Sequence, residues 1–100
     1  MREGPDIAHI AALIGDPARA NMLTALMSGK ALTATELARE AGVTPQTAST
    51  HLTKLEQGGL LTLQRQGRHR YFSLATDDVA HVLEALMGAG GLRRDTRLTR

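Results

Sequence analysis

The sequence predicts a mainly helical domain with one small β-hairpin, an α+β class. Apolar residues recur at helical spacing through most of the chain. The hydrophobic share of 42% consists mostly of Leu and Ala, with one Phe, one Tyr and no Trp, and this composition favours helices. After Gly58-Gly59 the pattern changes to two short runs whose side chains alternate, as they do in strands. One hundred residues suit a single domain with a modest core.

The first part of the chain predicts three helices, each with its own start and stop signals. The first begins at Asp6 and ends at Gly15. Asp16-Pro17 supplies the cap and first-turn proline of the second, which Ser28-Gly29 ends. A capping box of Thr33 and Glu36 starts the third, about two turns long, and Gly42 closes it. The inward-facing residues of the three helices are Ile7, Ile10, Leu13, Ile14, Ala20, Leu23, Leu26, Met27, Leu37, Ala38 and Ala41.

Residues 44–55, TPQTASTHLTKL, predict a fourth helix with an unusual outer face. Thr44 can cap this helix and Pro45 suits its first turn. At about 100° per residue, a narrow apolar stripe forms from Ala48, Leu52 and Leu55. The opposite face carries hydroxyl and amide groups and a single charge, from Gln46, Thr47, Thr50, Thr53, Lys54 and Gln57. Because such groups can meet base edges in the major groove of DNA, we interpret this helix as a recognition helix.

The segments on either side of this helix complete a winged helix-turn-helix pattern. Gly42-Val43 leaves a turn of about three residues between the third and fourth helices, as in a helix-turn-helix. Two strands are predicted at Leu60–Gln64 and Arg70–Leu74, and RQGRH between them supplies Gly67 for a turn. We interpret this hairpin as a wing. Its tip carries Arg65, Arg68 and Arg70, whose guanidinium groups suit contacts with a phosphate backbone or a minor groove.

Positive charge gathers in this part of the chain. Residues 54–76 hold four basic side chains and one acidic, although the net charge of the whole chain is only +2. A local basic surplus is expected where a protein meets DNA phosphates. His69, in the wing, either contacts DNA or is a solvated loop residue. His51 lies at the edge of the apolar stripe, where we favour packing at the edge of the core, with a phosphate contact as the alternative.

A last helix is predicted from Thr76-Asp77-Asp78, which offers caps and favourable negative charge. We expect Gly88-Ala89-Gly90-Gly91 to break this helix or let it fray. The closing segment LRRDTRLTR is basic, and is a tail, a linker or the start of a further element. We therefore assign residues 1–91 to a DNA-binding and dimerisation domain and residues 92–100 to a basic tail or the start of a linker. The apolar face of the last helix consists of Val79, Val82, Leu83, Leu86 and Met87.

The two ends of the chain carry more apolar residues than a small three-helix core needs. Such a surplus predicts a homodimer interface built from the first and last helices. The interface residues that we expect are Ile7, Ile10, Ile14, Val82, Leu86 and Met87. The flexible side chains of Met22, Met27 and Met87 also suit irregular gaps in a core of Leu and Ala.

The segment TPQTASTHLTKLEQGGLLTLQRQGRHRYFSL resembles the ArsR/SmtB family of winged-helix bacterial transcriptional repressors. The shared pattern is a Ser/Thr-rich helix, a His-Leu pair, a Gly-Leu step, a basic wing and a Tyr-aromatic-x-Leu end, and the likeness covers roughly residues 7–87. It implies a symmetric dimer on pseudo-palindromic operator DNA, with base contacts from Gln46, Ser49 and Thr50. The full set of candidate DNA contacts is Thr44, Gln46, Thr47, Ser49, Thr50, His51 and Lys54 in the recognition helix and Arg65, Arg68, His69 and Arg70 in the wing.

The sequence departs from the metal-sensing members of that family where their metal binds. Their third helix carries two cysteines just before an acidic residue and a leucine, whereas this chain has Thr33 and Thr35 before Glu36-Leu37. Hydroxyl groups cannot replace thiolates as ligands of soft metals. His81 and Glu84 have the spacing of half a zinc site. They lie earlier in the last helix than the position at which the family carries its zinc ligands. We therefore expect no metal site and no cofactor.

Several other functional classes find no support in the sequence. It contains no cysteine nucleophile, no glycine loop with Lys and Ser/Thr for phosphates and no His-Glu-x-x-His pair, so we expect no enzyme. It also contains no export signal and no apolar run near the roughly 20 residues that span a bilayer, and we expect a cytoplasmic protein. The alternative to a DNA-binding regulator is a winged-helix module that binds another protein.

Overall fold

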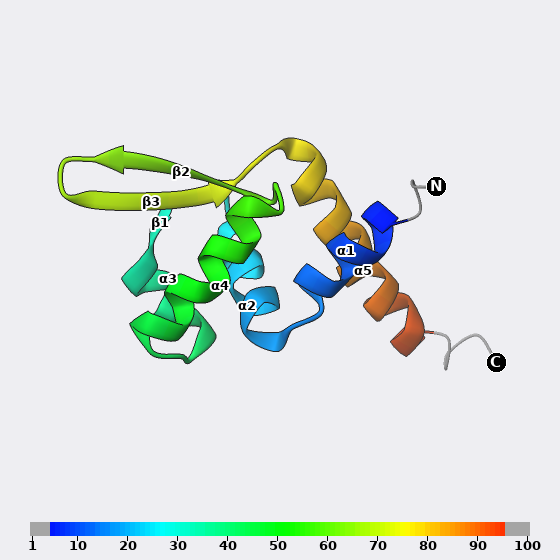
Figure 1. Ribbon diagram of the computed structural model, residues 1–100. Helices are drawn as coiled ribbons and strands as arrows, with labels where there is room; N and C mark the ends of the chain where they lie inside the picture. Colours follow the sequence, from blue (N-terminus) through cyan, green and yellow to red (C-terminus); the bar gives the residue numbers. More distant parts are fainter. Residues whose placement is uncertain (1–4, 96–100) are drawn as a thin grey trace.

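The computed structural model describes the backbone of residues 5–95 and the side-chain surroundings of residues 7–88. Within that range it contains five helices and a three-stranded sheet (Figure 1). This confirms the mainly helical α+β class, the helix-turn-helix and the wing. The elements in chain order are α1 (Pro5–Ile14), α2 (Pro17–Leu26), β1 (Leu32–Thr33), α3 (Ala34–Ala41), α4 (Pro45–Gln57), β2 (Leu61–Gln66), β3 (His69–Leu74) and α5 (Asp77–Asp95).

Local capping signals set the starts of the helices. Asp16 Oδ2 accepts a 3.0 Å hydrogen bond from the N–H of Arg19 at the start of α2. The capping box of α3 is confirmed, because the Thr33 N–H donates to Glu36 Oε1 at 2.8 Å and the Glu36 N–H donates to Thr33 Oγ1 at 3.1 Å. Gly42 closes α3 in the left-handed conformation, with φ of 68°.

The core lies among α2, α3, α4 and the sheet. The apolar stripe of α4 is confirmed, since Ala48, Leu52 and Leu55 are each at most 1% exposed. Met22 is fully buried in α2, as its gap-filling role requires. Met87 is 56% exposed, so its expected place in the core of a single chain is wrong. The other buried apolar residues are Leu13, Leu23, Leu26, Leu37, Ala38, Leu60, Leu61, Phe72 and Leu83.

The sheet has one strand that the sequence did not predict. Its order is β1-β3-β2, and both pairs of neighbours are antiparallel. The additional strand β1 contains only Leu32 and Thr33, which pair with Phe72 and Tyr71 of β3. Since Thr33 also caps α3, this short strand joins the base of the wing to the helix-turn-helix.

The wing is a tighter hairpin than the sequence predicts. β2 and β3 pair along their whole length, ending with Gln66 opposite His69. The turn therefore contains only Gly67 and Arg68, whereas a turn of five residues was expected. Gly67 has φ of 60°, a conformation that favours glycine at the first position of a two-residue hairpin turn.

Two helix ends differ from the predicted ones. α5 continues through Gly88-Ala89-Gly90-Gly91 to Asp95, so the predicted break is wrong. Glycine keeps its N–H, so the helical hydrogen bonds can continue at a cost of about 1 kcal/mol per glycine relative to alanine. α2 ends early, at Leu26, with Met27 rather than Ser28-Gly29 at its C-cap. Residues 1–4 and 96–100, including most of the predicted tail, lie outside the described residues.

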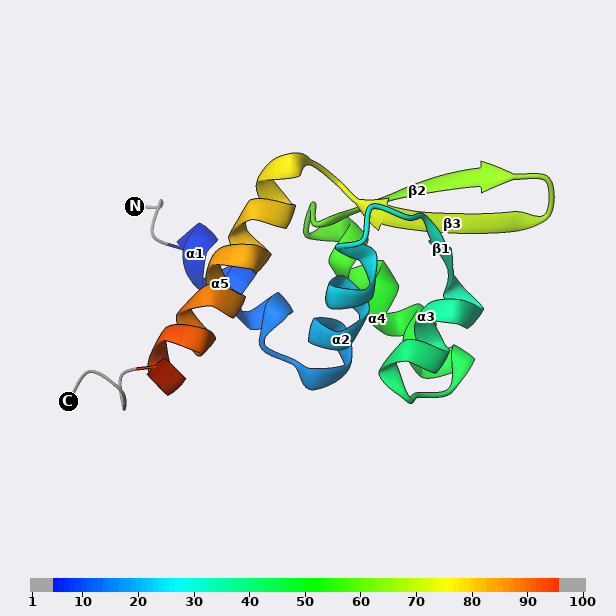
Figure 2. The same ribbon diagram turned by 180° about the vertical axis from the view of Figure 1, so that it is seen from behind.

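Figures 1 and 2 show the arrangement of these elements from opposite sides. The wing projects at one end of the molecule, while α1 and α5 lie together at the other end, and α2, α3 and α4 occupy the middle. The polar face of α4 and the arginines of the wing therefore belong to a different part of the molecule from the apolar residues of α1 and α5.

Candidate nucleic-acid interface

The outer face of α4 is open to solvent along its length. The cap is as predicted, since Thr44 Oγ1 accepts a 3.1 Å hydrogen bond from the N–H of Thr47 and Pro45 occupies the first turn. Burial of the opposite stripe against the core leaves the polar face outside. Six of the candidate contacts in this helix are exposed, namely Thr44, Gln46, Thr47, Ser49, Thr50 and Lys54.

The polar groups of α4 differ in how far their hydrogen bonding is already satisfied. Thr53 Oγ1 donates to the Ser49 carbonyl at 3.0 Å, and Thr50 Oγ1 makes a longer bond of 3.4 Å to the Gln46 carbonyl. Thr44 Oγ1 donates to Thr47 Oγ1 at 3.0 Å. The hydrogen bonds among the described residues leave the side chains of Gln46 and Ser49 free. These two side chains can therefore bond a ligand without breaking a bond within the protein.

The wing concentrates positive charge at exposed positions. Arg65 and Arg70 lie directly opposite each other in the register of β2 and β3, and Arg68 is in the turn. Like charges at opposite positions destabilise a strand pair, so an anion between them is favourable. The ion pairs between described residues do not include these arginines. His69 is also exposed, and its ring centroid lies 6.1 Å from that of Tyr71.

His51 is the candidate contact residue that does not lie on the open face. Its side chain is 17% exposed and contacts the start of α2. His51 Nδ1 is 3.0 Å from Arg19 Nη1, and Nε2 is 3.9 Å from Asp16 Oδ2. The half-buried ring agrees with the predicted packing at the edge of the core. The role of Arg19 was not predicted, because no local pattern indicates a contact between residues 32 positions apart.

Asp16 is held in its charged form by its position as a cap. The hydrogen bond from the Arg19 N–H lowers the pKa of the Asp16 carboxyl below its ordinary value. The positive charge of the Arg19 side chain acts in the same direction. The charged carboxylate also faces the N-terminus of α2, where the helix dipole favours negative charge.

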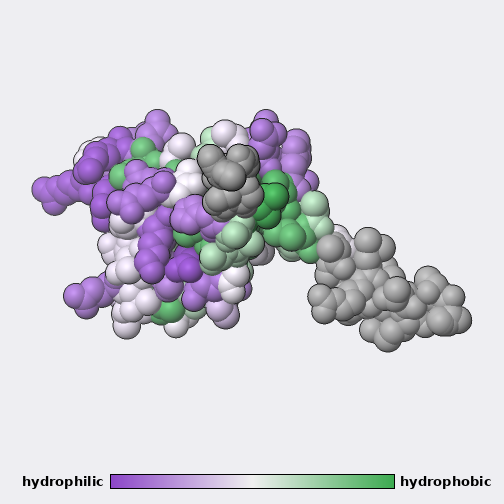
Figure 3. All heavy atoms as spheres, turned by 45° about the vertical axis from the view of Figure 1, so that its right-hand side comes forward, coloured by the Kyte–Doolittle hydropathy of each residue, from purple (hydrophilic) through white to green (hydrophobic). Residues whose placement is uncertain are grey.

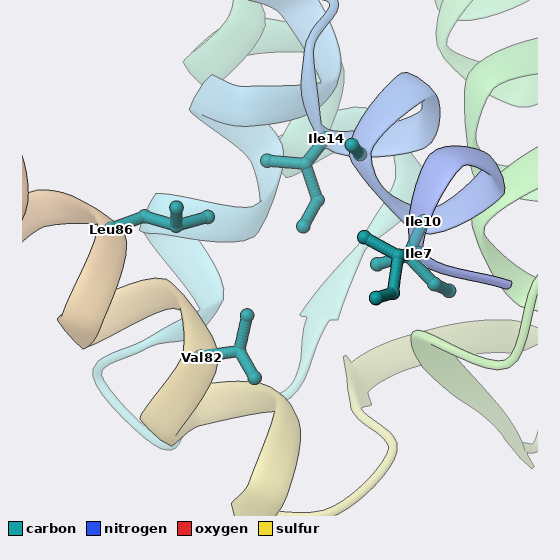
Figure 4. Close-up of a pocket in the computed structure, with 6 residues that line it drawn as sticks. Ile7, Ile10, Ile14, Val82 and Leu86 are labelled. Carbon is teal, nitrogen blue, oxygen red and sulfur yellow. The ribbon is translucent and has the colours of Figure 1, made fainter. Parts of the chain in front are cut away.

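A second exposed surface lies between α1 and α5 and is almost entirely apolar. Ile7 is 77% exposed, and Val82 and Leu86 are 48% and 51% exposed. A cavity of about 380 Å³ opens between the two helices (Figure 4), lined by Ile7, Ile10, Ala11, Ile14, Val82 and Leu86. Figure 3 shows hydrophobic residues gathered at this end of the molecule, while hydrophilic residues dominate the rest of the visible face. All six residues predicted for the dimer interface lie on these two helices.

The remaining candidate ligands do not form a site in the structure. Among the described residues, no three His, Asp or Glu side chains gather as a metal site would require. His81 and Glu84 are exposed on α5. Thr33 and Thr35 lie at the start of α3, where Thr33 is occupied as the cap. In the part of the chain that the structure describes, none of the helices has the length and hydropathy to cross a bilayer.

Comparison with known proteins connects this fold with transcriptional regulators. Residues 14–64, half of the chain, match the family described as "Helix-turn-helix domain". The chain is 47% identical over 83 residues to the uncharacterized HTH-type transcriptional regulator YdfF of Bacillus subtilis, covering 83% of this chain and 37% of YdfF. It thus spans little more than a third of the length of that relative.

Two further comparisons cover more of the other protein. The HTH-type transcriptional regulator CmtR of Mycobacterium tuberculosis is 32% identical over 87 residues, which are 87% of this chain and 72% of CmtR. The homodimeric winged helix-turn-helix DNA-binding domain of Mb0332 from Mycobacterium bovis superimposes with a TM-score of 0.84 at 23% identity, over 92% of this chain and 84% of that one. The fold, the helix-turn-helix match and the likeness to CmtR together show that this chain belongs to the ArsR/SmtB family of winged helix-turn-helix transcriptional regulators.

Proposed function

We propose that this chain binds operator DNA as a homodimer and regulates transcription, as a repressor that a signal releases. The observation that carries the proposal is the surface formed by α4 and the wing. The exposed face of α4 carries free amide and hydroxyl groups, and α4 contacts β2 of the hairpin that carries three arginines. The first can bond base edges, and the second can neutralise phosphates.

The start of α4 is the part that we propose for base contacts. In helix-turn-helix proteins the first residues of the recognition helix usually reach the bases. Gln46 and Ser49 have free side chains there, and Thr50 follows one turn after Gln46. Thr44, Thr47 and Lys54 border this surface and can bond phosphates or sugars. We assign His51 no base contact, because its ring nitrogens face Arg19 and Asp16.

The wing is the part that we propose for the DNA backbone. Arg65, Arg68 and Arg70, with His69 between them, present their side chains outside the protein. A phosphate between Arg65 and Arg70 would remove the repulsion of their opposed charges. Backbone contacts of this kind add affinity for any DNA sequence, and they make binding sensitive to salt.

The apolar surface of α1 and α5 is the part that we propose for dimerisation. Exposure of Ile7, Val82, Leu86 and Met87 is unfavourable in a single chain in water. The Mb0332 domain, which shares this fold, is homodimeric. Two copies related by a twofold axis would bury this surface and present two α4 helices to the two halves of a pseudo-palindrome.

The remaining parts of the proposal follow from this mode of action. A dimer that covers its operator represses by blocking access to the DNA, and it needs neither a catalytic residue nor a metal cofactor. We place the protein in the cytoplasm, where its DNA target lies. The alternative function, a winged-helix module that binds another protein, would leave the free groups of α4 and the opposed arginines without an anionic partner.

Selection of bound fragments from genomic DNA tests the proposal. We expect a common pseudo-palindrome among the retained fragments and a complex that dissociates as the salt concentration rises, because phosphate binding releases counterions. Random DNA of the same length is the control and should bind more weakly. Failure to retain any DNA at low salt would contradict the proposal and favour the protein-binding alternative.

A further inference from the structure

One side chain of α2 connects the dimerisation helix with the recognition helix. Arg19 Nε donates a 2.7 Å hydrogen bond to the Leu13 carbonyl, and Nη2 makes a longer one of 3.4 Å to the Ala12 carbonyl. Both carbonyls belong to the last turn of α1, whose carbonyl groups have no partners within the helix. On its other side, Arg19 Nη1 lies 3.0 Å from Nδ1 of His51, in the middle of α4.

The Arg19 contact restricts how the ring of His51 can form hydrogen bonds. A guanidinium group donates hydrogen bonds and accepts none, so Nδ1 must present its lone pair. The 3.0 Å contact is a hydrogen bond in the neutral tautomer of His51 that carries its proton on Nε2. That proton faces Asp16 Oδ2, at 3.9 Å from Nε2. Asp16 is itself fixed as the cap of α2, so all three side chains have defined positions.

A second contact joins α1 to α4 two turns further along. A Cβ atom at Gly58 would overlap Leu13 Cδ1, so the Leu13 side chain lies directly against the C-cap of α4. Leu13 is 7% exposed, and its carbonyl is the one that Arg19 bonds. His51 and Gly58 are seven residues apart, which places them on the same side of the helix. The end of α1 is thus attached to α4 at two points.

We propose that Arg19 and His51 are positioning residues that set the spacing at which a dimer reads its two half-sites. This proposal rests on the proposed function. α1 carries the proposed dimer surface and α4 the proposed base contacts, so the angle between them determines where each recognition helix meets the DNA. Half-sites lie about 34 Å apart or a multiple of that, and a small rotation of α4 changes which separation fits.

The test compares Arg19→Gln with the unaltered protein on operators whose half-site spacing is varied one base pair at a time. We expect affinity for the natural spacing to fall about tenfold, as loss of a charge-assisted hydrogen bond implies. Neighbouring spacings should lose less, so the preference becomes flatter, and the salt dependence should not change. Lys30→Gln removes one exposed positive charge elsewhere and should keep the sharp preference.

Other outcomes of this experiment would overturn the proposal. An equal loss at every spacing would show that Arg19 only stabilises the fold. A salt slope lower by about one would show that Arg19 contacts a phosphate directly. If the unaltered protein binds DNA and Arg19→Gln keeps its spacing preference, this inference fails while the proposed function stands. If the unaltered protein binds no operator, both fail.

A spectroscopic measurement tests the contact without any variant. Nitrogen-15 NMR of the unaltered protein should show His51 protonated on Nε2 and unprotonated on Nδ1 at neutral pH. A proton on Nδ1 would overturn the proposal. In the variants, His51→Leu combined with Arg19→Gln should change the spacing preference no more than either change alone, since both remove the same link. Additive changes would contradict that link.

Discussion

At the scale of single residues, the polar groups of α4 are not equivalent. Thr50 and Thr53 already donate to carbonyls one turn earlier in the helix, so their hydroxyl protons are partly engaged. Gln46 is in the first turn, is exposed and has a free amide, which can bond adenine through both N6 and N7. Among the candidate residues, Gln46 is therefore the one from which we expect the strongest discrimination between bases.

Gln46→Ala should relax the sequence preference at one base pair in each half-site. A bidentate contact discriminates between bases by about 1–3 kcal/mol, and the symmetry of a dimer applies this loss twice. The measurement is binding to a panel of operators varied one position at a time. Gln57→Ala, at the other end of the same helix, is the control and should leave the preference unchanged. An equal loss for every operator would instead place Gln46 on the DNA backbone.

Asp16 should make the stability of the protein depend on pH in the acid range. Its folded pKa lies below the ordinary value of 3.8, so the charge stabilises the fold above that pH, and the contribution disappears as pH falls through the folded pKa. Asp16→Asn keeps a good N-cap and removes the charge. Urea unfolding should therefore give Asp16→Asn a lower free energy of unfolding than the unaltered protein above about pH 4, and the difference should shrink on further acidification. Asp16→Ser, which also has a neutral cap, should behave like Asp16→Asn. A loss of unfolding free energy that does not depend on pH would refute the role of the charge.

At the scale of elements, the wing combines a tight turn with arginines that form no ion pair with any described residue. Its length places Arg68 far from the core, in a turn of two residues. A side chain at this position costs little to remove from the folded protein, since it is exposed to solvent. Substitutions at the tip of the wing can therefore report on DNA affinity without a change in stability.

Arg68→Ala should weaken binding to specific and random DNA alike. Each phosphate contact that is lost should lower the slope of log affinity against log salt by about one. Titrations at several salt concentrations provide the measurement, and Lys30→Ala, the loss of an exposed charge outside the wing, is the control. A changed base preference at constant slope would mean that Arg68 lies in a groove and responds to its shape or bases.

A glycine at the C-cap of α4 and one within α5 should respond in opposite ways to alanine. At Gly58 a Cβ would overlap Leu13 Cδ1 and lie 3.2 Å from the Lys54 carbonyl, so buried Leu13 must move. Overpacking of this kind costs about 1–3 kcal/mol. At Gly88, within α5, a Cβ meets nothing within 4 Å, and alanine should stabilise the helix by up to about 1 kcal/mol. Urea unfolding of the two variants measures the change in the free energy of unfolding, which should fall for Gly58→Ala and rise for Gly88→Ala. A change of the same sign and size in both would contradict this account.

The sequence predicts those elements whose signals lie within the element. The helix α4 was predicted from Thr44, Pro45 and its apolar stripe, and the capping box of α3 from Thr33 and Glu36. The two-residue strand β1 was missed, because only pairing with distant β3 makes it a strand. The end of α5 was misplaced, since glycine lowers helix propensity without preventing a helix. The exposed polar face could be anticipated in the same local way, whereas the contact of Arg19 with His51 depends on the packing of α2 against α4.

At the scale of the whole molecule, the two exposed surfaces lie in different places and have different chemistry. The polar surface belongs to α4 and the wing, and the apolar one to α1 and α5. Leu83 is the buried apolar residue of α5 among its described side chains. Val79 packs against the core as well, whereas Val82, Leu86 and Met87 are exposed and could contact a second copy of the chain.

Leu86→Glu should produce monomers. A carboxylate at the centre of an apolar interface would have to lose its hydration, which costs far more than one side chain contributes to association. Sedimentation of the unaltered chain at about 50 μM, where weak dimers persist by mass action, should show a dimer. Ala85→Glu adds the same charge at an exposed neighbouring position outside the cavity lining and should leave the dimer intact. A monomeric unaltered chain would disprove the interface.

Dimerisation through the apolar face of α1 and α5, as proposed, would also tie the response of the regulated gene to the number of protein copies in the cell. A dimer held by this face alone dissociates on dilution. Well below its dissociation constant, the concentration of dimer rises as the square of the chain concentration, so about a doubling of expression gives about a fourfold rise in the DNA-binding species. Promoter output would then change steeply around a threshold of expression, even for a single operator with no cooperation between neighbouring sites.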